Sequence, residues 1–173
     1  MSRNTAKYLS YREAWRRINA AITDGYFFEA VTLCESIISD RLLSYVRGVS
    51  PSSKATIRTS FATLITEWRK LAGTFPVHQT TDLGEAIDRW RVGRNAVVHG
   101  MTKSMPDTAT HELQSYMKRV EEAARSGAAL ARAVSNWHRR QLASYRNKNR
   151  VNDAPGDARA QFQSSRKEVS RNR

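Results

Sequence analysis

Apolar residues recur at steps of three and four along most of this chain, which is the period of an amphipathic helix. The clearest stripe predicts a helix over about residues 26–47, with one face formed by Phe27, Val31, Cys34, Ile38, Leu42 and Tyr45. Similar stripes predict helices over about residues 6–23, 51–71, 82–99 and 107–145. No strand pair or hairpin turn is evident between them. We therefore predict an all-α fold, a compact bundle of about five helices that ends in a long C-terminal helix.

Residues that start, stop or weaken helices separate these segments. Gly25 marks a short break that fits an antiparallel helical hairpin. Pro51 suits the first turn of the third helix, and Thr81 is expected to cap the fourth. Gly100 can take the left-handed position after the end of that helix. Gly127 weakens the long last helix locally and could mark a kink.

The charge of the chain favours a polyanionic partner. It has 29 Lys and Arg against 16 Asp and Glu, a net charge of +13, and polyanions are the natural partners of such a surface. Arginine provides 22 of the 29 cations. The forked donors of its guanidinium group suit phosphate. A codon bias toward arginine would give the same excess. Helical periodicity ends near residue 145, and residues 139–173 carry a net charge of +7. We expect a folded domain over residues 5–145 and a disordered basic tail over residues 146–173.

The sequence also predicts the cellular compartment of the protein. Cys34 is the single cysteine, so neither an intrachain disulfide nor a Cys-x-x-Cys metal site can form, and a reducing compartment is expected. The polar N-terminus lacks the apolar core of a signal peptide. No apolar run approaches the roughly 18 residues of a membrane span. We expect a cytoplasmic protein with no membrane partner.

The candidate chemistry lies in the sequence RNAVVH, residues 94–99, at the end of the fourth predicted helix. Arg94 can hold a phosphate with two donors, and His99 can move a proton near neutral pH. Asn95 is one helical turn before His99 and could fix the tautomer of its imidazole. None of the other three histidines has an arginine five residues before it.

The placement of Arg94 adds to this pattern. It falls between Trp90 and Val97 on the apolar stripe of its helix, so it should face other helices rather than solvent. An arginine there is costly unless it is paired or lines a cleft. A structural salt bridge would explain the position as well as a phosphate site does. For His99, the alternative is a histidine that caps the helix without any chemistry.

One helix does not direct both groups at one atom. Five residues separate Arg94 from His99, which places them about 140° apart around a helix. If two such helices meet across a two-fold axis, the arginine of each copy can approach the histidine of the other. Gly93 would allow close approach of the two backbones, or it could be incidental. The spacing therefore favours a homodimer with a shared site.

The chain resembles proteins of the HEPN superfamily, compact helical domains named for higher eukaryotes and prokaryotes nucleotide-binding. Residues 94–99 match the family motif of an arginine, a polar residue and, near a helix end, a histidine. The amphipathic segments YFFEAV (residues 26–31) and ESII (residues 35–38) resemble the early helices of the family. The resemblance covers residues 5–145, and the basic tail lies outside it.

The resemblance implies a metal-independent endoribonuclease that acts as a homodimer and needs no cofactor, of the kind found among toxins and phage-defence effectors. His99 would act as general base or acid, Arg94 would neutralise charge on the phosphate, and Asn95 would orient His99 or contact the phosphate. The RNA would be left with 2′,3′-cyclic phosphate and 5′-hydroxyl ends. Some such proteins act beside a small nucleotidyltransferase antitoxin, which here would be a separate chain. Other members lack the motif and only bind or scaffold.

Further charged residues are candidates for supporting roles. Glu35 flanks an apolar face of the second predicted helix and could pair with Arg94, or simply be solvated. Arg89 and Arg91 could guide RNA to the motif, or form a solvated face. Arg166 and Lys167 in the tail could bind nucleic acid without sequence preference, or contact an acidic partner.

Two other functions fit the same sequence. In the first, the chain is a non-catalytic helical module that binds nucleic acid through its basic tail. In the second, it is a regulatory subunit of a larger defence assembly, and its helices mainly make protein contacts. Dependence of RNA cleavage on residues 94–99 or on the tail separates the first of these from the ribonuclease.

Overall fold

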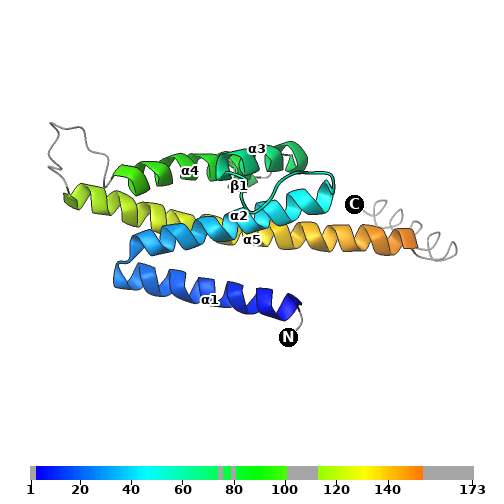
Figure 1. Cartoon of the computed structure of the whole chain (residues 1–173), viewed down its shortest axis with the longest axis horizontal. Coiled ribbons are helices and arrows are strands. Elements are labelled where there is room, and N and C mark those ends of the chain that lie inside the picture. The colour runs from blue at the N-terminus through cyan, green and yellow to red at the C-terminus, as the bar shows by residue number, and fades with distance from the viewer. Residues whose placement is uncertain (1–2, 74–75, 79–80, 101–112, 154–173) are drawn as a thin grey trace, which may run out of the picture. The chain divides into compact units, whose positions relative to one another are not determined.

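The computed structural model describes residues 3–73, 76–78, 81–100 and 113–153 (Figure 1). Its helices are α1 (Arg3–Asp24), α2 (Phe27–Val49), α3 (Phe61–Ala72), α4 (Leu83–Gly100) and α5 (Leu113–Asp153). The predicted all-α fold with a long last helix is confirmed. Two short strands, β1 (Pro76–His78) and β2 (Thr81–Asp82), pair in an antiparallel ladder before α4. The sequence did not predict this ladder, because strands of two or three residues are too short to show an alternating pattern.

The chain divides into two compact units, Met1–Asn136 and Trp137–Arg173. In the first unit, α2 packs against both α1 and α3, and α3 packs against α4, an order that Figure 1 also shows. The core of this unit includes the predicted stripe of α2, of which Val31, Cys34, Ile38 and Leu42 are fully buried.

The part of α5 in the first unit buries a regular apolar stripe, and Val120, Ala124, Ala131 and Val134 have no exposed surface. In the second unit, the structure describes the last turns of α5, which continues to Asp153. Residues 146–153, expected in the tail, are therefore helical, because arginine and lysine support a helix that has no apolar pattern. The rest of the predicted tail lies outside the described residues.

The third helix begins later than predicted, at Phe61 rather than near Pro51. In the segment before it, the Ser53 hydroxyl accepts a hydrogen bond from the backbone N–H of Ala55. Such serine and threonine contacts compete with helical hydrogen bonds, so the segment forms turns instead. Ser60 then caps α3, its side chain accepting a hydrogen bond from the first turn.

Helix α4 begins and ends differently from the prediction. Thr81 lies in β2, and the helix is capped instead by Asp82, whose Oδ2 accepts hydrogen bonds from the backbone N–H groups of Gly84 (2.9 Å) and Glu85 (3.2 Å). At the other end, Gly100 is the last helical residue and does not adopt a positive φ. Asp82 is better placed than Thr81 because its carboxylate also interacts favourably with the positive end of the helix dipole.

Candidate functional site

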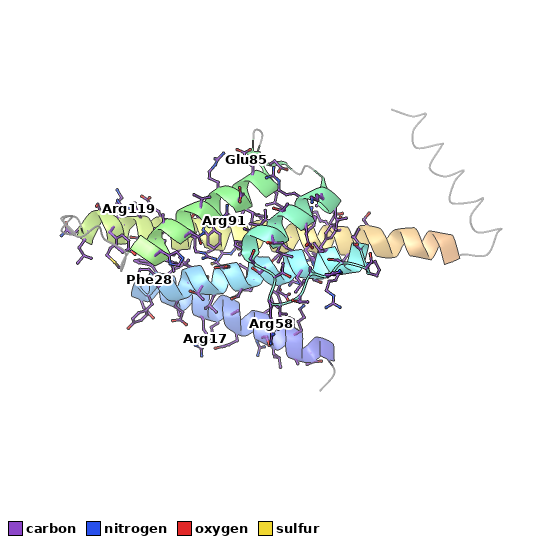
Figure 2. The ribbon with its side chains drawn as sticks, turned by 45° about the horizontal axis from the view of Figure 1, so that its top comes forward. Arg17, Phe28, Arg58, Glu85, Arg91 and Arg119 are labelled. Carbon is purple, nitrogen blue, oxygen red and sulfur yellow. The ribbon has the colours of Figure 1, made fainter. Side chains whose placement is uncertain are left out.

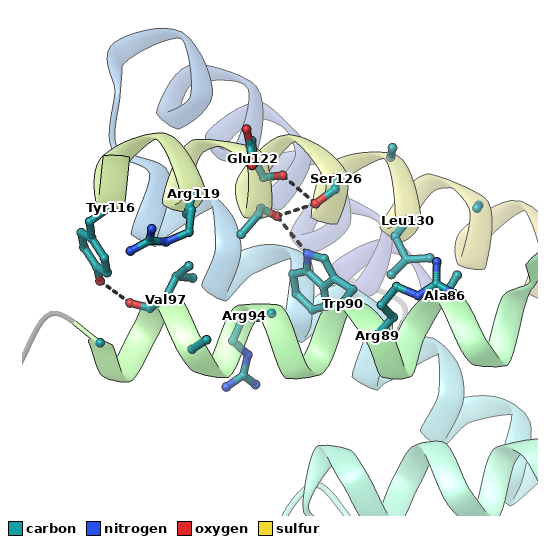
Figure 3. A pocket seen from close by; sticks show the side chains of 16 residues that line it. Ala86, Arg89, Trp90, Arg94, Val97, Tyr116, Arg119, Glu122, Ser126 and Leu130 are labelled. Atoms are coloured by element: carbon teal, nitrogen blue, oxygen red, sulfur yellow. Dashed lines mark hydrogen bonds between the residues drawn. The ribbon is translucent and has the colours of Figure 1, made fainter. Parts of the chain in front are cut away.

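Arg94 lies in the seam between α4 and α2, and its side chain is only 14% exposed. Its Nη2 forms an ion pair with Oε2 of Glu35 on α2, and the Glu35 side chain is 27% exposed. The inward orientation of Arg94, expected from the spacing of apolar residues, is present in the structure. Of the two alternatives for Glu35, pairing with Arg94 or solvation, the structure shows the pair. In Figure 3 the Arg94 guanidinium extends away from α5, whereas Trp90 and Val97 point toward it.

Asn95 holds the same guanidinium from a second side. Nη1 of Arg94 donates a hydrogen bond to Oδ1 of Asn95 at 2.7 Å. Nε of Arg94 is buried and has no hydrogen-bond partner among the described residues. The guanidinium is therefore fixed by one carboxylate and one amide, and an arginine has further N–H donors beyond the two that these contacts use.

His99 lies in the last turn of α4 and is exposed. The structure shows no hydrogen bond between its imidazole and Asn95, whose amide oxygen binds Arg94 instead. The expectation that Asn95 orients His99 is therefore not what these side chains do in this structure. Because Arg94 is drawn into the α2 seam and His99 faces out, the two groups of one copy do not converge.

Tyr116 is a residue of this site that the sequence pattern did not single out. It is buried on α5, and its hydroxyl donates a hydrogen bond to the carbonyl of Val97 (Figure 3). Its ring centroid lies 6.5 Å from that of Phe28 on α2. Tyr116 thus ties the last turn of α4, which carries His99, to two other helices. Its place on the buried stripe of α5 was the available signal, but the hydrogen bond to Val97 spans 19 residues of sequence.

The other arginines of α4 are partly neutralised by neighbours on the same helix. Arg89 bonds Glu85 at 2.5 Å, and Arg91 bonds Asp88 at 2.8 Å. Figure 2 shows Arg91 on α4 and Phe28 at the start of α2. Both arginines lie near the motif, as expected, but each already has a carboxylate partner. The two tail candidates, Arg166 and Lys167, lie outside the described residues.

Comparison with protein-family models, with curated proteins and with solved structures finds no match to this chain. Within the described residues, no three histidine, cysteine, aspartate or glutamate side chains gather to form a metal site. No helix in that part of the chain is long and apolar enough to cross a membrane. The geometry around Arg94 is therefore the feature of this chain that indicates a function.

Proposed function

We propose that this chain is a metal-independent endoribonuclease of the HEPN type that acts as a homodimer, as a toxin or phage-defence effector in the cytoplasm. The observation that carries the proposal is the fixed guanidinium of Arg94, held by Glu35 and Asn95 on the helix that presents His99 at its end. A partly buried arginine with donors to spare is suited to a phosphate. The net charge of +13 supports a polyanionic substrate.

The reaction uses the RNA's own nucleophile. The 2′-hydroxyl attacks the adjacent phosphorus, the bond to the 5′-oxygen breaks, and the products carry a 2′,3′-cyclic phosphate and a 5′-hydroxyl. His99 accepts the proton of the 2′-hydroxyl or donates one to the leaving oxygen. Arg94 stabilises the negative charge that develops on the phosphate oxygens. DNA lacks this nucleophile and should not be cleaved.

The homodimer follows from the separation of the two groups. Arg94 of one copy is held in its α2–α4 seam, whereas His99 of the same copy is exposed on another side of α4. A second copy related by a two-fold axis brings its His99 to the first Arg94, and the reciprocal pair forms the second site. A separate chain would inhibit such an enzyme, and our candidate for it is an antitoxin of the nucleotidyltransferase type.

The direct test is cleavage of RNA by the purified protein in EDTA. We expect cleavage with 2′,3′-cyclic phosphate ends, and activity at least a hundredfold lower in His99→Ala and in Arg94→Ala. Arg125→Ala is the matched control, since it removes an exposed arginine of α5 whose ion-pair partner among the described residues is Glu121. If the three variants and the wild type cleave alike, or if none cleaves, the catalytic assignment is wrong.

A mixing experiment tests the shared site. A heterodimer of Arg94→Ala and His99→Ala chains has one site with both residues intact and one with neither. Mixing the two inactive variants should therefore restore up to about half of the activity in each heterodimer that forms. If both single variants are inactive and the mixture, after exchange of subunits, stays inactive, the site is not composite.

A further inference from the structure

Tyr116 lies against the last turn of α4 at residues before and after His99. Its hydroxyl donates a hydrogen bond to the carbonyl of Val97 (Figure 3). Gly100 lies close to the ring edge, since an added Cβ at Gly100 would be 3.3 Å from Cε2 of Tyr116. Val98 packs against the same buried cluster. The turn is therefore held at the residues on either side of His99, whose own side chain is exposed.

The end of a helix is the part that most needs such support. The carbonyl groups of a last turn lack the intrahelical donors that carbonyls in the middle of a helix have. Terminal turns also open more readily than the middle of a helix. Val97 is among the last four residues of α4, which ends at Gly100. The Tyr116 hydroxyl supplies a donor there from α5, so a contact outside α4 holds its last turn.

Tyr116 is itself held in place by its neighbours. Its side chain is 7% exposed and forms a buried cluster with Val97 and Val120. The Phe28 ring of α2 packs against it, and the Arg119 guanidinium lies 5.8 Å from its ring centroid. Aromatic pairs and cations interact favourably with a ring at such separations. A ring with contacts to two other side chains keeps its hydroxyl at a fixed place beside α4.

Helix α2 connects this contact to Arg94. Phe28 and Glu35 are seven residues apart on α2, which is two turns and places them on the same face. Phe28 packs on the Tyr116 ring, and Glu35 forms the ion pair with Arg94. One face of α2 therefore supports Arg94 directly and, through Tyr116, the end of α4 that carries His99.

We infer that Tyr116 is a positioning residue, which fixes the point from which His99 projects toward the scissile phosphate. Its effect on catalysis rests on the proposed ribonuclease function. In the composite site, His99 must reach a phosphate that Arg94 of the other copy holds, so the direction of the last turn matters. Proton transfer requires hydrogen-bond reach, and a misplacement of about 1 Å can cost about a hundredfold in rate.

The first test measures the kinetics of RNA cleavage by the full chain with Tyr116→Phe, which removes the hydroxyl and keeps the ring. We expect kcat to fall about tenfold, because His99 is present but less well placed. KM should stay within about twofold, because Arg94 and the other cations are unchanged. Unchanged helical circular dichroism shows that the variant has folded. A folded Tyr116→Phe with the wild-type kcat would overturn the inference.

Tyr45→Phe is the matched control. The Tyr45 hydroxyl of α2 also donates a hydrogen bond to a carbonyl in the last turn of another helix, that of Leu71 in α3, at 3.5 Å. The same chemical change therefore removes the same kind of contact, but at the end of a helix that does not carry His99. Tyr45→Phe should keep kcat within about twofold of the wild type. An equal loss of kcat in both variants would mean that general loosening, and not the position of His99, lowers the rate.

The second test needs no RNA and measures amide hydrogen exchange by NMR. In Tyr116→Phe the backbone amide of His99 should exchange about tenfold faster than in the wild type, because the last turn of α4 opens more often. The amide of Trp90, in the middle of the same helix, should keep its wild-type rate. Tyr45→Phe should change neither amide. Equal exchange at His99 in the wild type and Tyr116→Phe would overturn the inference, because the hydroxyl would then not hold the turn.

Together the two tests separate this inference from the proposed function. If the wild type does not cleave RNA, the proposed function is wrong, and the exchange rate at His99 alone decides whether Tyr116 holds this turn. If the wild type cleaves RNA and Tyr116→Phe exchanges faster at His99 without a change in kcat, the ribonuclease stands and Tyr116 is not a positioning residue. Faster exchange at His99 together with a lower kcat and an unchanged KM supports both proposals.

Discussion

A single ion pair explains why an arginine occupies the apolar stripe of α4. Arg94 and Glu35 are both mostly removed from solvent, with 14% and 27% of their side chains exposed. Removing one partner of such a pair leaves the other charge poorly solvated and unbalanced, which costs more than the pair itself contributes. An arginine is therefore tolerated at this position only together with Glu35. The same ion pair fixes the guanidinium that we propose binds a phosphate.

This predicts an asymmetry between two glutamates. Glu35→Ala should lower the free energy of unfolding by about 2 kcal/mol, because Arg94 stays behind without a counter-ion. Glu121→Ala, which removes the partner of Arg125 on α5, should change it by less than about 0.5 kcal/mol, since that pair is 60% and 37% exposed and solvent screens it. Urea unfolding of the two variants and the wild type measures both values. Equal effects would contradict the interpretation of Arg94 as a partly buried charge.

At the level of single residues, the sequence predicts the direction of a side chain where the helical spacing of apolar residues alone determines it. The inward direction of Arg94 follows from its position between Trp90 and Val97. The sequence left open whether Glu35 pairs with Arg94 or is solvated, and the structure shows the pair. Asn95 binds Arg94 and not His99, and this outcome depends on side-chain rotamers, which the spacing of residues in the sequence does not fix. Tyr116 was missed because its hydroxyl binds a carbonyl on another helix, an interaction that no local pattern encodes.

At the scale of helices, the packing of α4 on α5 depends on one glycine. Gly127→Ala adds a methyl group 2.7 Å from the Trp90 ring, so the indole or the α5 backbone must move. Although alanine favours a helix by about 1 kcal/mol over glycine, we expect a net destabilisation of about 1–2 kcal/mol from overpacking.

Gly48→Ala is the matched control, because an added Cβ at that position of α2 meets nothing within 4 Å. It should leave stability unchanged or raise it by up to about 1 kcal/mol. Thermal or urea unfolding should thus give opposite signs for the same chemical change. If Gly127→Ala stabilises the protein as well, the close approach of Trp90 to α5 does not limit that position.

Helices α1 and α2 are joined by a cluster that makes stability depend on pH. The Tyr11 hydroxyl and the Lys7 ammonium both donate hydrogen bonds to the Asp40 carboxylate. Partial burial raises the pKa of Asp40, but these hydrogen bonds and the nearby cations outweigh it, so the pKa lies below its ordinary value. A carboxylate with a lowered pKa contributes stability above the pKa of the unfolded chain, about 3.9, and loses it as pH falls through the folded value.

Asp40→Asn should therefore cost about 1 kcal/mol at pH 7, a modest figure because the side chain is 40% exposed. The difference from wild type should shrink as pH falls below about 4, where the wild type begins to lose the same charge. Urea unfolding of both proteins at pH 7 and at about pH 2.5 measures it. Tyr11→Phe removes only one of the donors and should show a smaller version of the same pH dependence; a difference that is constant with pH would contradict the charge-based explanation.

The elements themselves were predictable to the extent that long stripes define them. Helices α1, α2 and α4 have nearly the predicted ranges, because each has an apolar face and a clear break beside it. The start of α3 was wrong because Pro51 also suits a turn, and the hydroxyl contacts that favour turns there are side-chain choices. The end of α5 was wrong because a polar helix can continue without any apolar period.

At the scale of the whole molecule, the excess of positive charge and the site on α4 are expected to make different contributions to the interaction with RNA. The full chain carries +13, and the residues after Asp153 include Arg166 and Lys167. If the site on α4 carries the function, these residues add only general attraction to RNA. Such attraction depends on salt in proportion to the number of phosphates that the protein neutralises.

A chain that ends at Asp153 keeps every described residue. It tests whether the site on α4 and the residues after Asp153 make separate contributions. We expect it to cleave RNA at saturating substrate within about twofold of the full chain, because Arg94 and His99 are unchanged. Its affinity for RNA at low salt should fall, and the slope of log K against log salt should become shallower by about 0.7 for each phosphate that the shortened chain no longer neutralises. Fluorescence anisotropy from about 50 to about 300 mM salt measures the slope.

Arg94→Ala in the full chain is the counterpart of this truncation, and it should abolish cleavage while most of the slope is kept. Only one of many cations is removed in that variant, whereas the group that stabilises the charge on the phosphate is absent. In the reverse result, truncation abolishes RNA binding and Arg94→Ala changes nothing. That result would assign the function to the tail, because binding of RNA would then depend on residues beyond Asp153 and not on Arg94.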